Sequence, residues 1–200
     1  MRNKVITLDG KLFKDKCINL HELILENNFI PDVLIGIASG GVKVLDEIPE
    51  ISINEYRFNL ELRRNSTKHK NKLSFIRYLN INILNFLRIM ESIYVDYKLY
   101  ISKKKDIKQS EKYLKKKRFI KTQLLQQEIK ISNKKVLIVD DAIDSGETVL
   151  VIKSALEEQF ENIEVKVGVI TKTLKYSYID PDFCLFKNVL IRFPWSNDFK

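Results

Sequence analysis

The chain has 200 residues, of which 44% are hydrophobic and 30% are charged, so it is long enough for one domain with a sizeable core. Its two cysteines, Cys17 and Cys184, are too few and too isolated for a disulfide framework or a thiolate metal site. The sequence has no stretch of signal-peptide form and no apolar run as long as a membrane span. We therefore expect a cytoplasmic protein without a membrane partner.

The net charge of +9 is unevenly distributed. Residues 56–135 hold 22 Lys and Arg against 6 Asp and Glu, whereas the rest of the chain holds 13 bases and 20 acids. A basic segment of this kind attracts nucleic acid, acidic lipid or a phosphorylated substrate. It is also typical of a plain solvated surface, an interpretation that we favour by about two to one.

The N-terminal third of the chain predicts a helix followed by a buried strand. Residues 19–28 carry apolar side chains at helical spacing and end in an Asn-Asn pair. The apolar run 32–37 then leads into Ala38-Ser39-Gly40-Gly41 and a short helical segment to about residue 48. Paired glycines after a strand allow a ligand to approach the main chain closely.

The middle of the chain predicts one or two strands, a loop and two helices. Residues 51–62 alternate loosely, and the polar, basic residues 63–72 show no periodicity. From 73 to 100 apolar residues leave little polar surface, so this helix must be covered by the body, by its neighbour or by another subunit. A weaker helical pattern follows at 106–131, with a basic run at 115–118. We interpret the two as an antiparallel helical pair with its basic face turned outward.

The stretch 136–148 carries the clearest chemistry. Four apolar residues predict a buried strand, Asp140 and Asp141 stand at its carboxyl end, and a loop of small and hydroxyl residues enters a helix at about Glu147. Ligands of parallel sheets bind beyond the strand ends, and a loop that enters a helix directs N–H groups at an anion. Acids repel a phosphate but suit sugar hydroxyls or a bridging metal. The stretch therefore predicts a sugar-phosphate site.

This stretch resembles the phosphoribosyl-pyrophosphate (PRPP) signature of the type I phosphoribosyltransferases: an apolar run, two acids, two residues, Asp, Ser or Thr, Gly, any residue and Thr. The resemblance implies that Asp140 and Asp141 bind the ribose hydroxyls and Mg²⁺, directly or through the ligand. It implies that Asp144 is the catalytic acid–base group, that a basic loop at 63–72 closes over the active site, and that Ser39, Gly40 and Gly41 bind pyrophosphate. The residues that it implies for the 5′-phosphate are Ile143, Asp144, Ser145, Gly146, Glu147 and Thr148.

The C-terminal region resembles the hypoxanthine and xanthine type of this family. A strand at 165–170 closes on Lys172, and residues 189–195, with Phe-Pro-Trp at their end, resemble the hood that covers the base. The resemblance implies that Lys172, Leu190 and Ile191 bind the base. Three residues depart from the family pattern: Ser39, Leu190 and Ser196. The family usually has a basic residue, an aromatic residue and an acidic residue at these positions, in that order.

Together these features predict an α/β protein with the type I phosphoribosyltransferase fold, in which a central, mainly parallel sheet is flanked by helices and a small C-terminal hood. Residues 1–200 form one domain in this interpretation, and 64–131 form an insertion made of the basic mobile loop and the helical pair. We expect a pentosyltransferase of purine salvage that uses Mg²⁺, PRPP and a purine-like base and releases pyrophosphate. A homodimer is the default expectation.

An alternative of a different class fits the same residues. It is a PRPP- or nucleotide-binding regulator or adaptor, altered in its catalytic residues, that uses the basic insertion to bind nucleic acid or a partner protein. The complete PRPP signature favours the enzyme, whereas the changes at residues 39, 190 and 196 favour the regulator.

Overall fold

The computed structural model describes residues 4–52, 55–62, 80–102, 107–127 and 129–199. The expected basic loop at 63–72 and the lysines at 103–105 lie outside these ranges. At the centre is a five-stranded sheet in the order β3-β2-β4-β5-β6, in which all neighbouring strands are parallel. Its strands are β2 (Val33–Ile37), β3 (Tyr56–Leu60), β4 (Lys135–Ile143), β5 (Glu164–Lys172) and β6 (Phe183–Lys187). The predicted fold class is confirmed.

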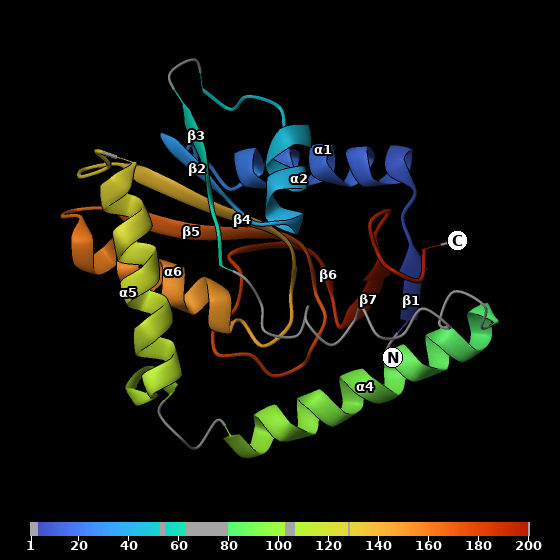
Figure 1. The fold of residues 1–200 in the computed structure, drawn as a ribbon. Coiled ribbons are helices and arrows are strands. Elements are labelled where there is room, and N and C mark those ends of the chain that lie inside the picture. The colour runs from blue at the N-terminus through green and yellow to red at the C-terminus, as the bar shows by residue number, and fades with distance from the viewer. Residues whose placement is uncertain (1–3, 53–54, 63–79, 103–106, 128, 200) are drawn as a thin grey trace.

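Helices cover both faces of this sheet (Figure 1). One face carries α1 (Gly10–Glu26) and α2 (Gly40–Glu47), and the other carries α5 (Glu111–Gln126) and α6 (Glu147–Gln159). Side chains of β4 alternate between two cores, because Leu137 packs with α1 and α2 whereas Val136 and Ile138 pack with α5 and α6. A strand buried on both faces must be apolar throughout, which explains why the sequence shows continuous apolar runs here.

The N-terminal part of the chain contains more helix and strand than its sequence predicts. The helix expected at 19–28 begins at Gly10, where the Asp9 side chain accepts the Leu12 N–H at 2.8 Å. A second, two-stranded sheet joins β1 (Lys4–Thr7) to β7 (Val189–Arg192) in parallel. Strand β1 was not predicted, because four residues are too few to establish a period of two.

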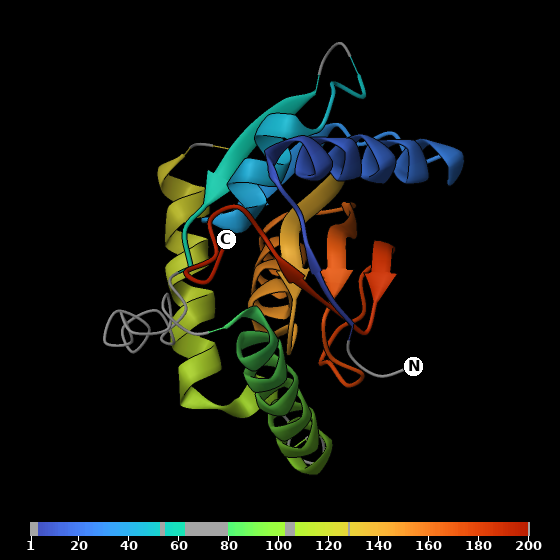
Figure 2. The same cartoon turned by 90° about the vertical axis from the view of Figure 1, so that its right-hand side faces the viewer.

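The predicted antiparallel helical pair is wrong for the residues that the structure describes. The long helix α4 (Ile81–Ser102) crosses beside β1 and β7, whereas α5 runs along α6, and the two helices diverge in both views (Figures 1 and 2). A short 3-10 turn, η2 (Ile107–Gln109), precedes α5. Helix α5 turns Tyr113, Ile120 and Leu124 into the sheet core, so its apolar side is not free to pair with α4. None of the described helices is long and apolar enough to cross a membrane.

A buried charge cluster ties α4 to β7 and to the C-terminal segment. The Arg192 side chain, 1% exposed, donates to Thr7 Oγ1 at 3.0 Å, to Asn85 Oδ1 at 2.8 Å and to Asp198 Oδ2 at 3.1 Å. Arg88 of α4 pairs with the same Asp198 carboxylate and donates to the Ile191 carbonyl. Burial alone would raise the pKa of Asp198, but the hydrogen bonds and charges of Arg88 and Arg192 hold this pKa below its ordinary value.

We expect Asp198→Asn to lower the free energy of unfolding at neutral pH by about 3 kcal/mol, because the change leaves buried arginine charge without its carboxylate. An acid with a lowered pKa stabilises the fold above its unfolded-state pKa, and this contribution is lost as the pH falls. The deficit of the variant should therefore shrink below about pH 4 in urea unfolding measured across pH. An equal deficit at pH 7 and in acid would contradict this electrostatic role.

Candidate active site

The carboxyl ends of β2, β4 and β5 bring three predicted segments to one edge of the sheet. Gly36 lies opposite Val139, Asp140 opposite Val169, and Ile143 opposite Lys172. The Ser39 loop, the stretch from Asp140 and the end of β5 therefore adjoin one another. This edge is where open parallel sheets bind ligands.

The two acids at the end of β4 have different surroundings. Asp140 is 2% exposed, and its Oδ1 accepts the N–H of Asp141 at 2.9 Å. Asp141 is half-buried, and its Oδ2 accepts the indole N–H of Trp195 at 3.2 Å. The Lys43 ammonium lies 5.1 Å from the centre of the Trp195 ring. The C-terminal segment thus reaches the acid pair, a contact that the sequence reasoning missed.

The glycine pair at the start of α2 has a packing reason that the sequence alone did not reveal. A Cβ on Gly40 would overlap the Asp141 carboxylate, and a Cβ on Gly41 would overlap the carbonyl oxygen of Val139. The first turn of α2 therefore touches the end of β4 directly. Ser39 precedes it as an exposed N-cap whose side chain makes no capping hydrogen bond, and the Ala38–Ser39 peptide bond is cis.

The loop from Asp144 to Thr148 has the form of an anion cradle. Gly146 adopts a left-handed φ of 75° as the N-cap of α6, and it supplies no side-chain cap. The N–H groups of the first turn of a helix have no partners within the helix, so this end can receive an anion. The segment 178–179 packs against this loop. The Tyr178 N–H donates to the Ser145 carbonyl at 2.8 Å, and a Cβ on Gly146 would press on Ile179. The Ile143 side chain is buried, so a ligand could meet only its main chain.

Asp144 and Lys172, which were predicted to lie near the base, both contact the loop that follows β5. The exposed Asp144 accepts the Thr173 hydroxyl at 2.5 Å, which orients its carboxylate. The Lys172 ammonium is paired with Asp180 and donates to the Lys175 carbonyl at 3.3 Å. Lys172 would therefore have to exchange Asp180 for a base oxygen.

The two predicted base contacts on β7 are both buried. Leu190 is 9% exposed and lies opposite Val5 of β1, and Ile191 is 5% exposed within the core beneath α1. Neither side chain stands open at the surface.

Lysines of helix α5 pair with Glu147, the acidic residue of the anion cradle. Lys116 Nζ lies 2.6 Å from Glu147 Oε1, and Lys112 Nζ lies 3.5 Å from Glu147 Oε2. Burial would raise the pKa of Glu147, but the hydrogen bond and charge of Lys116, joined by Lys112, hold it below its ordinary value. The basic run is thus partly paired within the chain, which a count of charges along the sequence could not indicate.

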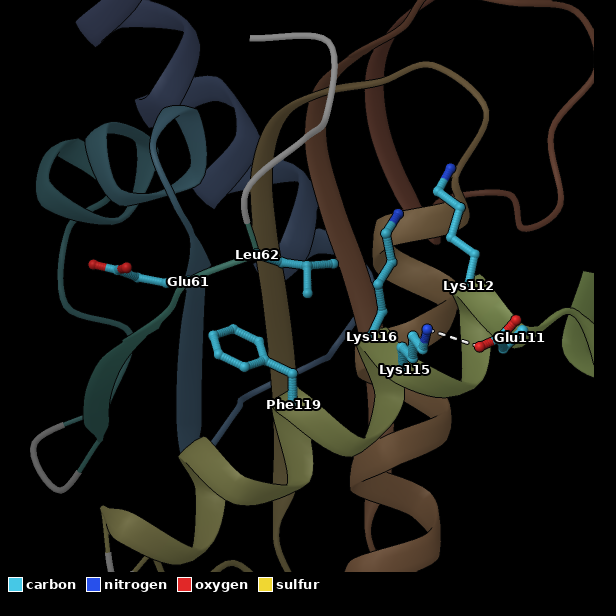
Figure 3. A pocket seen from close by; sticks show the side chains of 7 residues that line it. All are labelled: Glu61, Leu62, Glu111, Lys112, Lys115, Lys116 and Phe119. Carbon is cyan, nitrogen blue, oxygen red and sulfur yellow. Dashed lines mark ion pairs between the residues drawn. The ribbon is translucent and has the colours of Figure 1, made fainter. Parts of the chain in front are cut away.

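A cavity of about 730 Å³ opens between the end of β3 and α5 (Figure 3). Lys115 pairs with Glu111 at its wall, and Phe119 lies on the side of Leu62. Because Lys112 and Lys116 line this cavity and also pair with Glu147, it adjoins the anion cradle. The cavity therefore continues the candidate site from this edge of the sheet toward α5.

The donor set at the sheet edge fits Mg²⁺ bound mainly through a ligand. The described residues contain no group of three or more His, Cys, Asp or Glu that could hold a metal ion alone. Mg²⁺ is commonly bound by one or two carboxylates together with substrate phosphates. The half-buried Asp141 supplies one such carboxylate, whereas Asp140, 2% exposed, would have to be uncovered to supply a second.

Comparisons with known proteins agree with this geometry. The family model for the phosphoribosyl transferase domain matches residues 87–195, more than half of the chain and including most of α4 and all of α5. No curated protein matches the sequence.

Among solved structures, a purine phosphoribosyltransferase from Pyrococcus horikoshii superposes with a TM-score of 0.57 at 16% identity, covering 96% of this chain and 93% of that one. A xanthine-guanine-hypoxanthine phosphoribosyltransferase from Helicobacter pylori gives 0.52 at 12% identity, with the same coverages. A hypothetical protein from Neisseria gonorrhoeae with bound ppGpp gives 0.51 at 14% identity, covering 98% and 90%. At these identities the likeness shows a shared fold.

We expect Gly41→Ala to displace the end of β4 and to lower both the melting temperature and any affinity for a sugar phosphate, because its new methyl group meets a backbone carbonyl. Gly10→Ala is the matched control, since nothing lies within 4 Å of a Cβ at that position. Thermal unfolding and calorimetric titration with ribose 5-phosphate would separate the two. Equal behaviour of both variants would show that the close contact is unimportant.

Proposed function

The chain belongs to the phosphoribosyl transferase domain family, and from this membership we propose that it transfers 5-phosphoribosyl from PRPP to a ring nitrogen of a purine-like base. One observation carries the proposal: the acid pair, the glycine loop and the helix-capping loop adjoin at one edge of the sheet. Hydroxyl acceptors beside an anion cradle match the two ends of a ribose 5-phosphate. The purine specificity of the Pyrococcus and Helicobacter neighbours supports the class of base.

In the proposed reaction, a bond forms between a base nitrogen and C1 of the ribose as the bond from C1 to the pyrophosphate oxygen breaks. The electron pair of the broken bond leaves with pyrophosphate. Asp140 and Asp141 accept hydrogen bonds from the ribose hydroxyls, and the first turn of α6 receives the 5′-phosphate. Mg²⁺, when bound, supplies charge neutralisation at the pyrophosphate. The protein contributes positioning, charge stabilisation and exclusion of water.

The proton of the attacking nitrogen is assigned to Asp144. Its carboxylate is exposed at the sheet edge and is held by the Thr173 hydroxyl, so it can accept a proton without first changing its rotamer. Lys172 lies close by through the shared end of β4 and β5, and it would meet an exocyclic oxygen of the base after leaving Asp180. The polar base contacts would then come from strand β5.

The first test is the reaction itself. With PRPP and Mg²⁺, we expect pyrophosphate release with at least one of hypoxanthine, guanine, xanthine and adenine. Asp144→Asn should lower turnover by about 10²-fold or more, with little change in PRPP affinity, because general acid–base catalysis contributes on this scale. Glu161→Gln is the control, since it removes an exposed acid beyond the C-terminal end of α6 and away from the site. Full activity in Asp144→Asn would remove this residue from the mechanism.

A nucleotide-binding regulator is the second candidate. The Neisseria neighbour with bound ppGpp supports nucleotide binding by this fold, and Ser39 supplies no charge to the glycine loop. Against a nucleic-acid role, four lysines of α5 are paired with Glu147 and Glu158 of α6. PRPP or nucleotide binding without pyrophosphate release from any of the four bases would favour the regulator.

Lys116→Gln should weaken PRPP binding roughly five- to tenfold, because Glu147 would then keep only the more distant Lys112 to offset its charge beside the 5′-phosphate. Lys115→Gln serves as the control, since Lys115 pairs with the exposed Glu111 instead. Affinity is measured by calorimetry at low and moderate salt. The same loss in both variants would assign the effect to overall charge rather than to the Glu147 pair.

A further inference from the structure

Helix α4 presents a broad apolar face to solvent. Ten of its large hydrophobic side chains are exposed, among them Phe86, Tyr94 and Tyr97, each more than 60% accessible. Ile81 lies on the side of the buried Leu99, five turns away, so nine of the ten form the face; if each offers about 100 Å², the face exposes roughly 900 Å², which exceeds the usual largest apolar patch of a monomer. It also exceeds the area of roughly 800 Å² that each partner contributes to a standard interface.

This face cannot turn inward, because the other side of α4 is fixed to the body. Leu84 and Leu99 are buried there, Arg88 binds Asp198 and the Ile191 carbonyl, and Asp96 accepts the Tyr176 N–H at 2.9 Å. In both views the helix lies at the outside of the molecule (Figures 1 and 2). The sequence prediction that this helix must be covered is therefore not met by the described residues of one chain.

The exposed face has the spacing of a coiled-coil seam. Residues separated by alternating steps of four and three form one stripe along the helix: Ile83, Leu87, Met90, Tyr94, Tyr97 and Ile101. Such a stripe packs against another helix of the same kind.

We propose that a second copy of this chain covers this face, with the two α4 helices antiparallel. Glu91 and Lys98 follow Met90 and Tyr97 and flank the seam on one side, while Phe86 and Ile93 flank it on the other. An antiparallel pair with its axis near Tyr94 places Glu91 of each copy beside Lys98 of the other. A parallel pair would place Glu91 beside Phe86 and Lys98 beside Ile93 of the other copy, so charge complementarity selects the antiparallel arrangement.

The polar residues of the face also argue against a lipid surface. Helices that lie on membranes carry Lys and Arg along their polar flank, whereas the charges flanking this seam are one acid and one base. The proposed dimer would fix the helix whose Asn85 and Arg88 hold Arg192 and Asp198 in place. Dimer formation would thus stabilise the C-terminal segment whether or not the proposed reaction takes place.

Sedimentation velocity of the full chain at tens of micromolar should show a dimer, since an interface of this size supports micromolar or tighter association. Tyr94→Glu combined with Tyr97→Glu should give a folded monomer, because both side chains are exposed. Leu125→Glu, at an exposed apolar residue of α5, is the matched control and should remain dimeric. A wild-type monomer would overturn the proposal, and its co-sedimentation with anionic lipid vesicles would assign the face to a membrane instead.

Charge exchange tests the orientation. Glu91→Lys and Lys98→Glu should each raise the dimer dissociation constant roughly tenfold, because symmetry turns two attractive contacts into two repulsive ones. The double variant should restore the wild-type constant. A double variant no tighter than the singles would contradict the antiparallel pairing.

Discussion

The direct contact between the first turn of α2 and the end of β4 is the constraint on which the rest of the site depends. Gly40 and Gly41 allow this approach, since a side chain at either would collide with Asp141 or with the Val139 carbonyl. The contact sets the glycine loop beside the acid pair, which is the arrangement that the proposed reaction of PRPP requires. A glycine pair of this kind is therefore a structural requirement of the site as well as a candidate ligand contact.

The C-terminal segment is joined to this centre through two kinds of interaction. Trp195 donates its indole N–H to Asp141, which links the hood to the acid pair. The buried Arg192 and Asp198 then connect β7 to α4 and to β1. These polar contacts connect α4 to the hood, and Asp96 connects it to the loop after β5, so α4 supports both segments.

Much of the sheet could be predicted, because strands buried on both faces leave continuous apolar runs and the PRPP stretch has a fixed order of residues. The fold class and the position of this stretch at the end of β4 were predicted in this way. Strand β1 was missed because it is short. The helical pair was predicted wrongly because an amphipathic pattern shows that a helix buries one face, but does not show which element covers that face. The pairing of Lys116 with Glu147 joins residues 31 apart, and no local pattern encodes it. The roles of the individual site residues stay predictions.

The central claim is that the end of β4 and the first turn of α6 bind a 5-phosphoribosyl group, and a crystal structure with Mg²⁺ and PRPP tests it most directly. The account predicts ribose hydroxyls within hydrogen-bond distance of Asp140 and Asp141, and the 5′-phosphate on the N–H groups of residues 145–148. PRPP bound in the α5 cavity instead, with both acids free of ligand, would contradict it.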